Sequence, residues 1–414
     1  MKKYPMQLIL FGGLLVLFTP AANAQWVRTN GPWSTVACQQ CHNVTALAVS
    51  GSNVFAGTNG GIFLSLNNGT SWAAVDSGLT NDSVLSIAVN GSAVFAGTHG
   101  GAFQSTNNGT RWTAVNSGLT NTTVTSFAVS GGSVFAGTHG GGVFRSDNNG
   151  TNWSAVNSGL TNDTVLSLAV SGGSVFSGTH GGGVFRSDNN GTNWSAVDSG
   201  LTNASVLSLT VGGSAVVAGT NGGGIFRSVN NGAGWTAVNT GLTNDTVLSL
   251  AVSGGSVFSG TRGGGVFLSA NNGTSWTAVN SGLTDTNVRA LAVCGSTLFA
   301  GTHSGVWSRP LSEMIPVINH ELPGEPQNPS AFKLTVPTRS NRNTAVSFSL
   351  PRSEPITIAI YNSSGYEIAT LVSKNLGSGS HSFYWDTRTM ASGYYTVRIQ
   401  GGLNTFVKSV LIFR

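Results

Sequence analysis

The chain has 414 residues, enough for two or more domains, and only 8% of them are charged. The formal net charge of +5 does not indicate a nucleic-acid partner, because residues 25–309 contain eight Arg, eight Asp, no Lys and no Glu. The excess positive charge lies before residue 25 and after residue 309, so the long middle region is neutral and offers no basic face.

The first 24 residues are typical of a secretory signal peptide. Lys2 and Lys3 form a charged start, an apolar run follows over 8–18, and Ala22-Asn23-Ala24 is a small-residue cleavage site. The apolar run is too short to span a bilayer, and no later stretch is long enough. We expect the mature chain to begin near Gln25, to be secreted or held at the outer cell surface, and to lack a transmembrane segment.

A repeat of about 41 residues fills the region 25–309. A Trp closes each copy of the pattern S-x-N-N-G-x-x-W, at intervals of 40, 41, 41, 41 and 41 residues: Trp72, Trp112, Trp153, Trp194, Trp235 and Trp276. One unit predicts four short strands, at 165–170, 174–178, 184–187 and 192–197, separated by Gly and Asn turns. Four strands in such a period indicate one blade of an all-β propeller.

The two ends of the repeat region complement each other. An apolar residue that leads through Ala or Thr to Val occurs seven times, whereas the Trp pattern occurs six times: Leu47, Ile87, Phe127, Leu168, Leu209, Leu250 and Leu291 mark the seven copies. The last unit ends at Trp307 and Ser308 without a fourth strand, and Trp26 begins a segment that partly resembles one. We therefore predict a seven-bladed propeller closed by the N-terminal strand, which removes open sheet edges.

The Trp pattern resembles the Asp-box, or BNR repeat, S-x-D-x-G-x-x-W, of sialidases, sortilin-type receptors and photosystem II assembly-factor-like propellers. All six copies carry Asn at the Asp position: Asn67, Asn107, Asn148, Asn189, Asn230 and Asn271. The resemblance implies motifs between the third and fourth strands, on the side away from the active site. Asn bonds nearby backbone, Asn-Gly tolerates positive φ, and Trp packs between blades. We therefore predict that these residues form structural turns.

A sialidase-like activity finds no support in the residue types. The resemblance implies a Tyr nucleophile paired with a Glu, an Asp acid/base and three Arg, but residues 25–309 contain neither Tyr nor Glu. Glycosidases in general need two opposed carboxylates. The Asp residues fall at repeated loop positions, as Asp82 and Asp163 do. We predict no catalytic residues, no enzyme activity and no metal site, with a carbohydrate-active enzyme as the alternative.

One connection is six residues longer than its counterparts and contains Cys38-Gln39-Gln40-Cys41-His42. C-x-x-C-H is the attachment motif of c-type haem, in which two thiols reach the vinyl groups and the His ligates iron. The insertion alone cannot build an apolar haem pocket. A disulfide between Cys38 and Cys41 therefore stands beside haem, metal binding and free thiols as alternatives. Cys294, on the opposite face, is expected to be a small buried residue.

The turn between the second and third strands varies from blade to blade, as a binding surface should. Its variable positions are Asn59, His99, His139, His180, Asn221, Arg262 and His303. Counting strands places these turns on the same face as the CQQCH insertion. His99, His139, His180, Arg262 and His303 are therefore candidate ligand-face residues for a metal or an anion. The alternative is that each His simply caps a Gly-rich turn.

The composition changes after Arg309. A Pro-rich linker is expected over 310–328 and a small Ig-like β-sandwich over 329–414, with strands in the runs AVSFSLP, ITIAIYNSSG, HSFYWD, GYYTVRI and FVKSVLIFR. This segment resembles the type A C-terminal sorting domain of type IX secretion systems. The matching residues include Asn328-Pro329, Trp385-Asp386, Gly393-Tyr394-Tyr395 and the end from Lys408 to Arg414. The resemblance implies the type IX secretion machinery as a partner.

These features together predict a secreted or cell-surface propeller that binds an unknown surface protein or glycan without catalysis. The propeller domain is expected over 25–309, after the signal peptide of residues 1–24. A redox protein that carries one c-type haem on Cys38, Cys41 and His42 is the second possibility. No other cofactor is expected.

Overall fold

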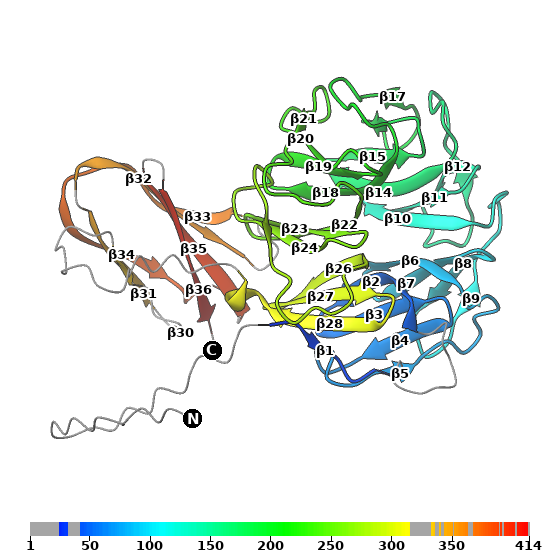
Figure 1. Ribbon diagram of the computed structural model, residues 1–414, viewed down its shortest axis with the longest axis horizontal. Coiled ribbons are helices and arrows are strands. Elements are labelled where there is room, and N and C mark those ends of the chain that lie inside the picture. The colour runs from blue at the N-terminus through cyan, green and yellow to red at the C-terminus, as the bar shows by residue number, and fades with distance from the viewer. Residues whose placement is uncertain are drawn as a thin grey trace, which may run out of the picture.

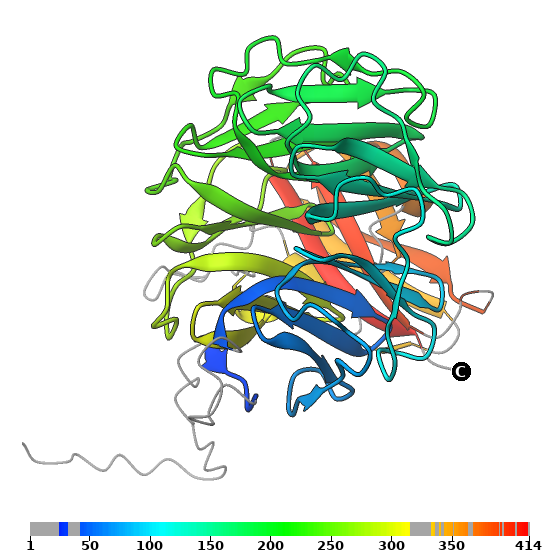
Figure 2. The same ribbon diagram turned by 90° about the vertical axis from the view of Figure 1, so that its right-hand side faces the viewer.

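The computed structural model describes residues 25–31, 42–314, 333–335, 339–340, 343–350, 352–362, 367–388, 390, 393–401 and 404–412. Seven four-stranded antiparallel sheets follow one another along the chain up to residue 310. Figure 1 shows them in order from blue through green to yellow, and Figure 2 shows the same succession from the side. The prediction of a seven-bladed propeller is therefore confirmed.

Each blade has four strands of unequal length. The first strands are β2 (Val44–Ser50), β6 (Val84–Asn90), β10 (Val124–Ser130), β14 (Val165–Ser171), β18 (Val206–Gly212), β22 (Val247–Ser253) and β26 (Val288–Cys294). The second strands are β3 (Asn53–Thr58), β7 (Ala93–Thr98), β11 (Ser133–Thr138), β15 (Ser174–Thr179), β19 (Ala215–Thr220), β23 (Ser256–Thr261) and β27 (Thr297–Thr302).

The outer half of each blade is shorter. The third strands are β4 (Gly61–Ser65), β8 (Gly101–Ser105), β12 (Gly142–Ser146), β16 (Val184–Ser187), β20 (Ile225–Ser228), β24 (Gly265–Ser269) and β28 (Gly305–Pro310). The fourth strands are β5 (Ala73–Ala74), β9 (Thr113–Ala114), β13 (Ser154–Ala155), β17 (Ser195–Ala196), β21 (Thr236–Ala237), β25 (Thr277–Ala278) and, in the last blade, β1 (Val27–Arg28). A short 3₁₀ helix, Leu311–Glu313, follows β28.

The N-terminal strand closes the ring. Val27 and Arg28 of β1 pair with Ser308 and Trp307 of β28, and the two strands lie side by side in Figure 1. The first strands contact one another in a closed circle, since β26 meets both β22 and β2. Every sheet of the ring is thereby flanked by two neighbours, as closure of a propeller requires.

Small and branched residues make the joint between blades. The first residue of every first strand is a fully buried Val. It packs against a Gly of the preceding blade's second strand. A Cβ on Gly178 would lie 2.6 Å from Cγ1 of Val206, and one on Gly301 would lie 2.5 Å from Cγ1 of Val44. The same Gly–Val fit therefore joins the last blade to the first.

The fourth strands are shorter than predicted. The sequence pattern predicts a strand over 192–197, whereas β17 contains only Ser195 and Ala196. The preceding residues are held in the turn instead, because the backbone N–H of Thr192 and of Asn193 donate to the main-chain and side-chain oxygens of Asn189. Local side-chain bonds have here outcompeted the strand ladder.

The propeller has two faces. The mouth face carries the turns between second and third strands together with the connections that enter each blade; His139 N–H, for example, bonds the Thr123 carbonyl. The corner face carries the other two sets of turns, which meet across blades. There Asn90 of β6 bonds the side chain of Asn149, which follows β12 in the next blade.

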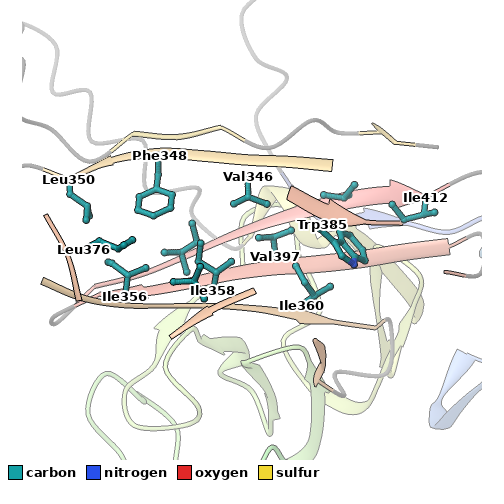
Figure 3. Packing of buried hydrophobic residues seen from close by; sticks show 13 residues of the cluster. Val346, Phe348, Leu350, Ile356, Ile358, Ile360, Leu376, Trp385, Val397 and Ile412 are labelled. Atoms are coloured by element: carbon teal, nitrogen blue, oxygen red, sulfur yellow. The ribbon is translucent and has the colours of Figure 1, made fainter. Parts of the chain in front are cut away.

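The C-terminal region forms two sheets around one core. One sheet orders β29 (Lys333–Thr335), β31 (Asn343–Leu350) and β34 (Gly379–Asp386), and the other orders β30 (Arg339–Ser340), β36 (Asn404–Ile412), β35 (Gly393–Gly401), β32 (Glu354–Tyr361) and β33 (Glu367–Leu376). Figure 3 shows the apolar side chains of both sheets, among them Phe348, Ile358 and Trp385, facing one another. The predicted β-sandwich is confirmed.

The sequence reading missed β33. Its ten residues are mostly exposed, and only Val372 and Leu376 are buried. An edge strand with so few buried positions lacks the alternation that identifies a strand.

Candidate functional site

The first Asn of each of the six Trp patterns makes the same hydrogen bonds. In the copy at 146–153, Asn148 Oδ1 accepts from the Ser146 hydroxyl at 2.9 Å and from the Asn152 backbone N–H at 2.9 Å. The Ser146 oxygen in turn accepts the Gly150 N–H at 2.8 Å. The equivalent bonds recur at Asn67, Asn107, Asn189, Asn230 and Asn271. Each such segment is called a corner below.

The next residue of every corner is an Asn with positive φ. The angles lie between 52° and 59° at Asn68, Asn108, Asn149, Asn190, Asn231 and Asn272. Asn tolerates this left-handed conformation better than other residues with a side chain, and the Gly that follows extends it. The second Asn of each corner therefore sets the backbone of the turn, while the first Asn caps it.

The corner Trp residues join neighbouring blades. Trp153 donates its indole N–H to the Val115 carbonyl of the preceding blade at 2.7 Å, and its backbone N–H to Ser117 at 2.8 Å. Trp112, Trp194, Trp235 and Trp276 repeat the indole bond to Val75, Val156, Val197 and Val238. All five rings are buried.

The ring closure reuses this joint. Trp26, which precedes β1, is 2% exposed and donates its indole N–H to the Val279 carbonyl at 2.7 Å. Trp72, in the first blade, donates instead to the Thr29 hydroxyl at 3.1 Å. Trp26 thus occupies the place of a seventh corner Trp, and the segment after it receives the bond from the first blade.

Most of the CQQCH insertion lies outside the described residues. Cys38 and Cys41 are among the residues that the structure leaves undescribed, so neither haem attachment nor a disulfide is tested. His42 is half-buried, and its Nε2 has no hydrogen-bond partner within the part of the chain that the structure describes. The neighbouring Asn43 carbonyl accepts the N–H of Asn59, which places the end of the insertion beside a turn of the mouth face. Cys294 is free and buried, near Gly51 on the corner face.

The candidate ligand-face residues are spread around the mouth face. His99, His139, His180, Arg262 and His303 are all exposed. Arg262 and His303 lie next to a half-buried arginine, Arg289, described below. Within the described part of the chain, no three His, Cys, Asp or Glu side chains gather closely enough to hold a metal ion.

A bulge aims one residue of each first strand into the central channel. In β14 the pairing with β15 shifts between Val165 and Ser167, which leaves Leu166 unpaired, and the same shift occurs in the other six blades. A bulge re-aims its side chain in this way. The seven bulged residues are Thr45, Leu85, Thr125, Leu166, Leu207, Leu248 and Arg289.

Five of the seven bulged residues border a depression at the mouth of the channel. It has a volume of about 500 Å³ and is lined by Thr45, Leu166, Leu207, Leu248, Arg262, Asn287 and Arg289. Three leucines of consecutive blades form an apolar wall, while two arginines and an amide form a polar wall. The sequence reading missed Arg289, although it stands where the other blades have Leu or Thr.

The polar wall lies where the last two blades meet. Arg262, in the turn before β24, forms an isolated bridge with Asn287 of the connection that enters β26. Arg289 Nη2 lies 2.9 Å from Nε2 of His303, so the neutral imidazole accepts a hydrogen bond from the guanidinium. The Nε of Arg289 and Oδ1 of Asn287 are buried without a hydrogen-bond partner among the described residues.

Burial and a like charge disturb this wall. Burial lowers the pKa of Arg289, the charge of Arg262 lowers it further, and Asp285 acts in the opposite direction. Asp285 Oδ1 accepts the Asn287 N–H at 3.1 Å, and its Oδ2 accepts the Ser304 N–H at 2.8 Å. Burial raises the pKa of Asp285, but these bonds and those of the Ser304 and Thr302 hydroxyls outweigh burial, and the pKa is lowered.

Two segments match known family models. Residues 86–207 match the DUF6242 beta propeller domain, and residues 336–413 match the secretion system C-terminal sorting domain. Neither match covers half of the chain. A search of curated proteins found no match.

Solved structures of three other proteins share the fold. YCF48 bound to D1 peptide is 15% identical, with a TM-score of 0.56, over 69% of this chain and 96% of that one. PorZ, an essential bacterial surface component of the type IX secretion system of Porphyromonas gingivalis, is 16% identical, with a TM-score of 0.56, over 90% of this chain and 60% of that one. The GH74 xyloglucanase from Xanthomonas campestris is 15% identical, with a TM-score of 0.55, over 79% of this chain and 59% of that one.

At these identities the structures establish the fold alone. The sorting-domain match indicates export to the cell surface or secretion, and it implies contact with the secretion machinery. Among the described residues, no helix is long and apolar enough to cross a membrane. The chain therefore combines a seven-bladed β-propeller with a C-terminal sorting domain of the type IX secretion system.

Proposed function

We propose that this protein is a binding or adhesion propeller without catalytic activity, displayed at the cell surface or released after type IX secretion. One observation carries the proposal. The residues that join the blades recur around the ring, whereas Arg262 and Arg289 depart from the repeat where they line a depression on the mouth face. A surface that varies on a repetitive scaffold is what a binding protein needs.

The corners are proposed as structural turns of an Asp-box, or BNR-like, repeat. Support comes from Asn148, whose acceptor oxygen is engaged by Ser146 and by a backbone N–H, and from the indoles that join blades. Asp differs from Asn at this oxygen only in charge, so both residues can accept the same bonds. Six equivalent corners also fit a scaffold better than a catalytic centre.

The absence of catalysis is proposed from the chemistry of the depression. Glycoside hydrolysis needs two carboxyl groups across the scissile bond. The described residues that line the depression are hydroxyl, aliphatic, amide and guanidinium side chains. Asp285 is close, but backbone N–H groups occupy both of its oxygens.

The proposed processing follows the order of segments. A signal peptide of residues 1–24 directs export, the propeller comprises 25–309, a linker comprises 310–328, and the sorting domain comprises 329–414. The secretion machinery reads the sorting domain after export. Deleting residues 329–414 should leave the propeller in the periplasm, as detected by fractionation and surface labelling. Undiminished surface delivery of the truncated chain would contradict this part of the proposal.

A binding screen tests the main proposal. The full-length chain is presented to arrays of glycans and of bacterial and host surface proteins, and bound partners are ranked. We expect at least one partner whose binding falls when the mouth face is altered by Arg262→His, a change to the residue found in other blades. The matched control is Arg186→Leu, which removes a corner-face arginine where other blades have Leu. Equal binding by both variants would place the ligand away from the mouth.

A further inference from the structure

The depression at the channel mouth has two unlike walls, and this asymmetry restricts its ligand. Leu166, Leu207 and Leu248 come from three consecutive blades and offer aliphatic surface. Arg262 and Arg289 face the same space from the last two blades. Its volume is about 500 Å³, and it is open to solvent.

The two guanidinium groups are under-compensated. No described residue forms an ion pair with Arg262 or Arg289. Asp285, the carboxylate that acts on Arg289, is held by the N–H groups of Asn287 and Ser304. Two cations beside this carboxylate leave a positive surplus, and a guanidinium group forms charge-assisted hydrogen bonds with a carboxylate.

Asn287 adds no contact through its side-chain oxygen. Its Oδ1 is buried from solvent without a hydrogen-bond partner among the described residues, and so are Asn43 Oδ1 and Ser205 Oγ at the equivalent position of two other blades. This feature therefore belongs to the repeat. A ligand that suits the depression has a carboxylate and an aliphatic part.

We propose that the channel mouth binds a carboxylate that carries an aliphatic group, as at the C-terminal end of a peptide whose last residue is aliphatic. Arg262 and Arg289 hold the carboxylate, and the leucines contact the aliphatic side chain. The site favours this ligand over an acidic glycan, because three leucines match an aliphatic side chain and do not match a hydroxylated ring. This inference rests on the proposed binding function, and it identifies the class of ligand.

Three small molecules separate the features of the site. N-acetyl-leucine has both groups, its amide lacks the charge, and glucuronic acid has the carboxylate on a sugar. Titration calorimetry on the full-length chain at low salt should show saturable binding of N-acetyl-leucine, with affinity at least about tenfold weaker for the amide and for glucuronic acid. No binding, equal binding of the amide, or tighter binding of glucuronic acid would overturn the proposal, the last in favour of an acidic glycan.

The repeat supplies variants that should fold. Arg289→Leu and Arg262→His introduce residues found at the same positions of other blades, and each should weaken binding of N-acetyl-leucine at least about tenfold. Leu248→Thr, which copies the first and third blades, should weaken it less. Arg186→Leu is the control on the corner face and should leave the affinity unchanged. Full affinity in Arg289→Leu would disprove the assignment.

The proposed function can fail separately from this inference. A surface partner whose binding N-acetyl-leucine does not reduce would leave the binding function intact and refute the ligand class. Saturable binding of N-acetyl-leucine without any partner in the surface screen would support the ligand class and refute binding of a surface partner.

Discussion

The two faces of the propeller use one repeat in opposite ways. On the corner face, Asn148 and its five counterparts have nearly the same acceptor bonds, and the Trp that follows each of them joins two blades. On the mouth face, the seven bulged positions share a backbone but carry Leu in four blades, Thr in two and, at Arg289, a charged side chain in one. Repetition maintains the ring where side chains are engaged, and variation is tolerated where they project into the channel.

The largest effect is expected at the ring closure, where corner chemistry is completed by the N-terminal segment. Trp26→Ala removes a ring that is 2% exposed and bonded to Val279, and should lower the free energy of unfolding by about 3–5 kcal/mol. Urea unfolding followed by circular dichroism measures the loss. Trp153→Ala, at a buried Trp that joins two interior blades, is the matched control and should cost less. Equal losses would show that closure adds nothing beyond the burial of one more Trp.

The mouth face should respond in the opposite direction. Arg289→Leu removes a buried Nε that has no partner among the residues described, together with the repulsion from Arg262, and should raise the free energy of unfolding by about 1–3 kcal/mol. The melting temperature of the ligand-free chain checks the direction. A stabilised variant that has lost its ligand would sharpen the contrast between the faces. A destabilised variant would show that Arg289 belongs to the scaffold.

Disrupting a single corner should lower the free energy of unfolding less than disrupting the ring closure. Asn148→Ala removes the acceptor for Ser146 and for the Asn152 N–H, and should cost about 1 kcal/mol of the free energy of unfolding. Asn148→Asp keeps both acceptor bonds and should be nearly neutral. Urea midpoints of the two variants separate a structural corner from a surface position. A loss as large for Asp as for Ala would require another role for the amide.

The smallest effect on the free energy of unfolding is expected when the pH is lowered. Hydrogen bonds from Arg145 and then from Ser133 lower the pKa of Asp147, and Arg186 and Ser174 do the same for Asp188. A lowered pKa stabilises the fold above the unfolded value of about 3.9, and this contribution is lost as the pH falls through the lower folded pKa. Both carboxylates are more than half exposed, so each contributes at most about 1 kcal/mol. The free energy of unfolding should depend less on pH between about pH 2 and pH 6 in the Asp147→Asn, Asp188→Asn double variant. A substitution on the mouth face should not change this dependence.

Most of the architecture was predictable because the scaffold residues recur. The period of the Trp residues and the seven Val-ending runs indicated seven blades, and the incomplete last unit indicated closure by Trp26 and its neighbours. The fourth strands were predicted too long, since the composition of 192–197 does not reveal that Asn189 holds the backbone of Thr192 and Asn193.

The candidate site was predictable only in part. Arg262 and His303 were identified because their turns vary between blades, and the structure places both beside Arg289. Arg289 was missed because the sequence shows only a change of side chain within a predicted strand, which resembles ordinary variation. Only the bulge, a backbone feature that the side-chain pattern does not encode, shows that this position faces the channel.

The pairing of β1 with β28 has a consequence for export. The indole of Trp26 reaches a carbonyl 253 positions along the chain, and Val27 pairs with Ser308. Contacts this distant in sequence form slowly, since nearly the whole intervening segment must be available before they can form. The ring therefore cannot close until β1 and β28 are both present on the same side of the membrane.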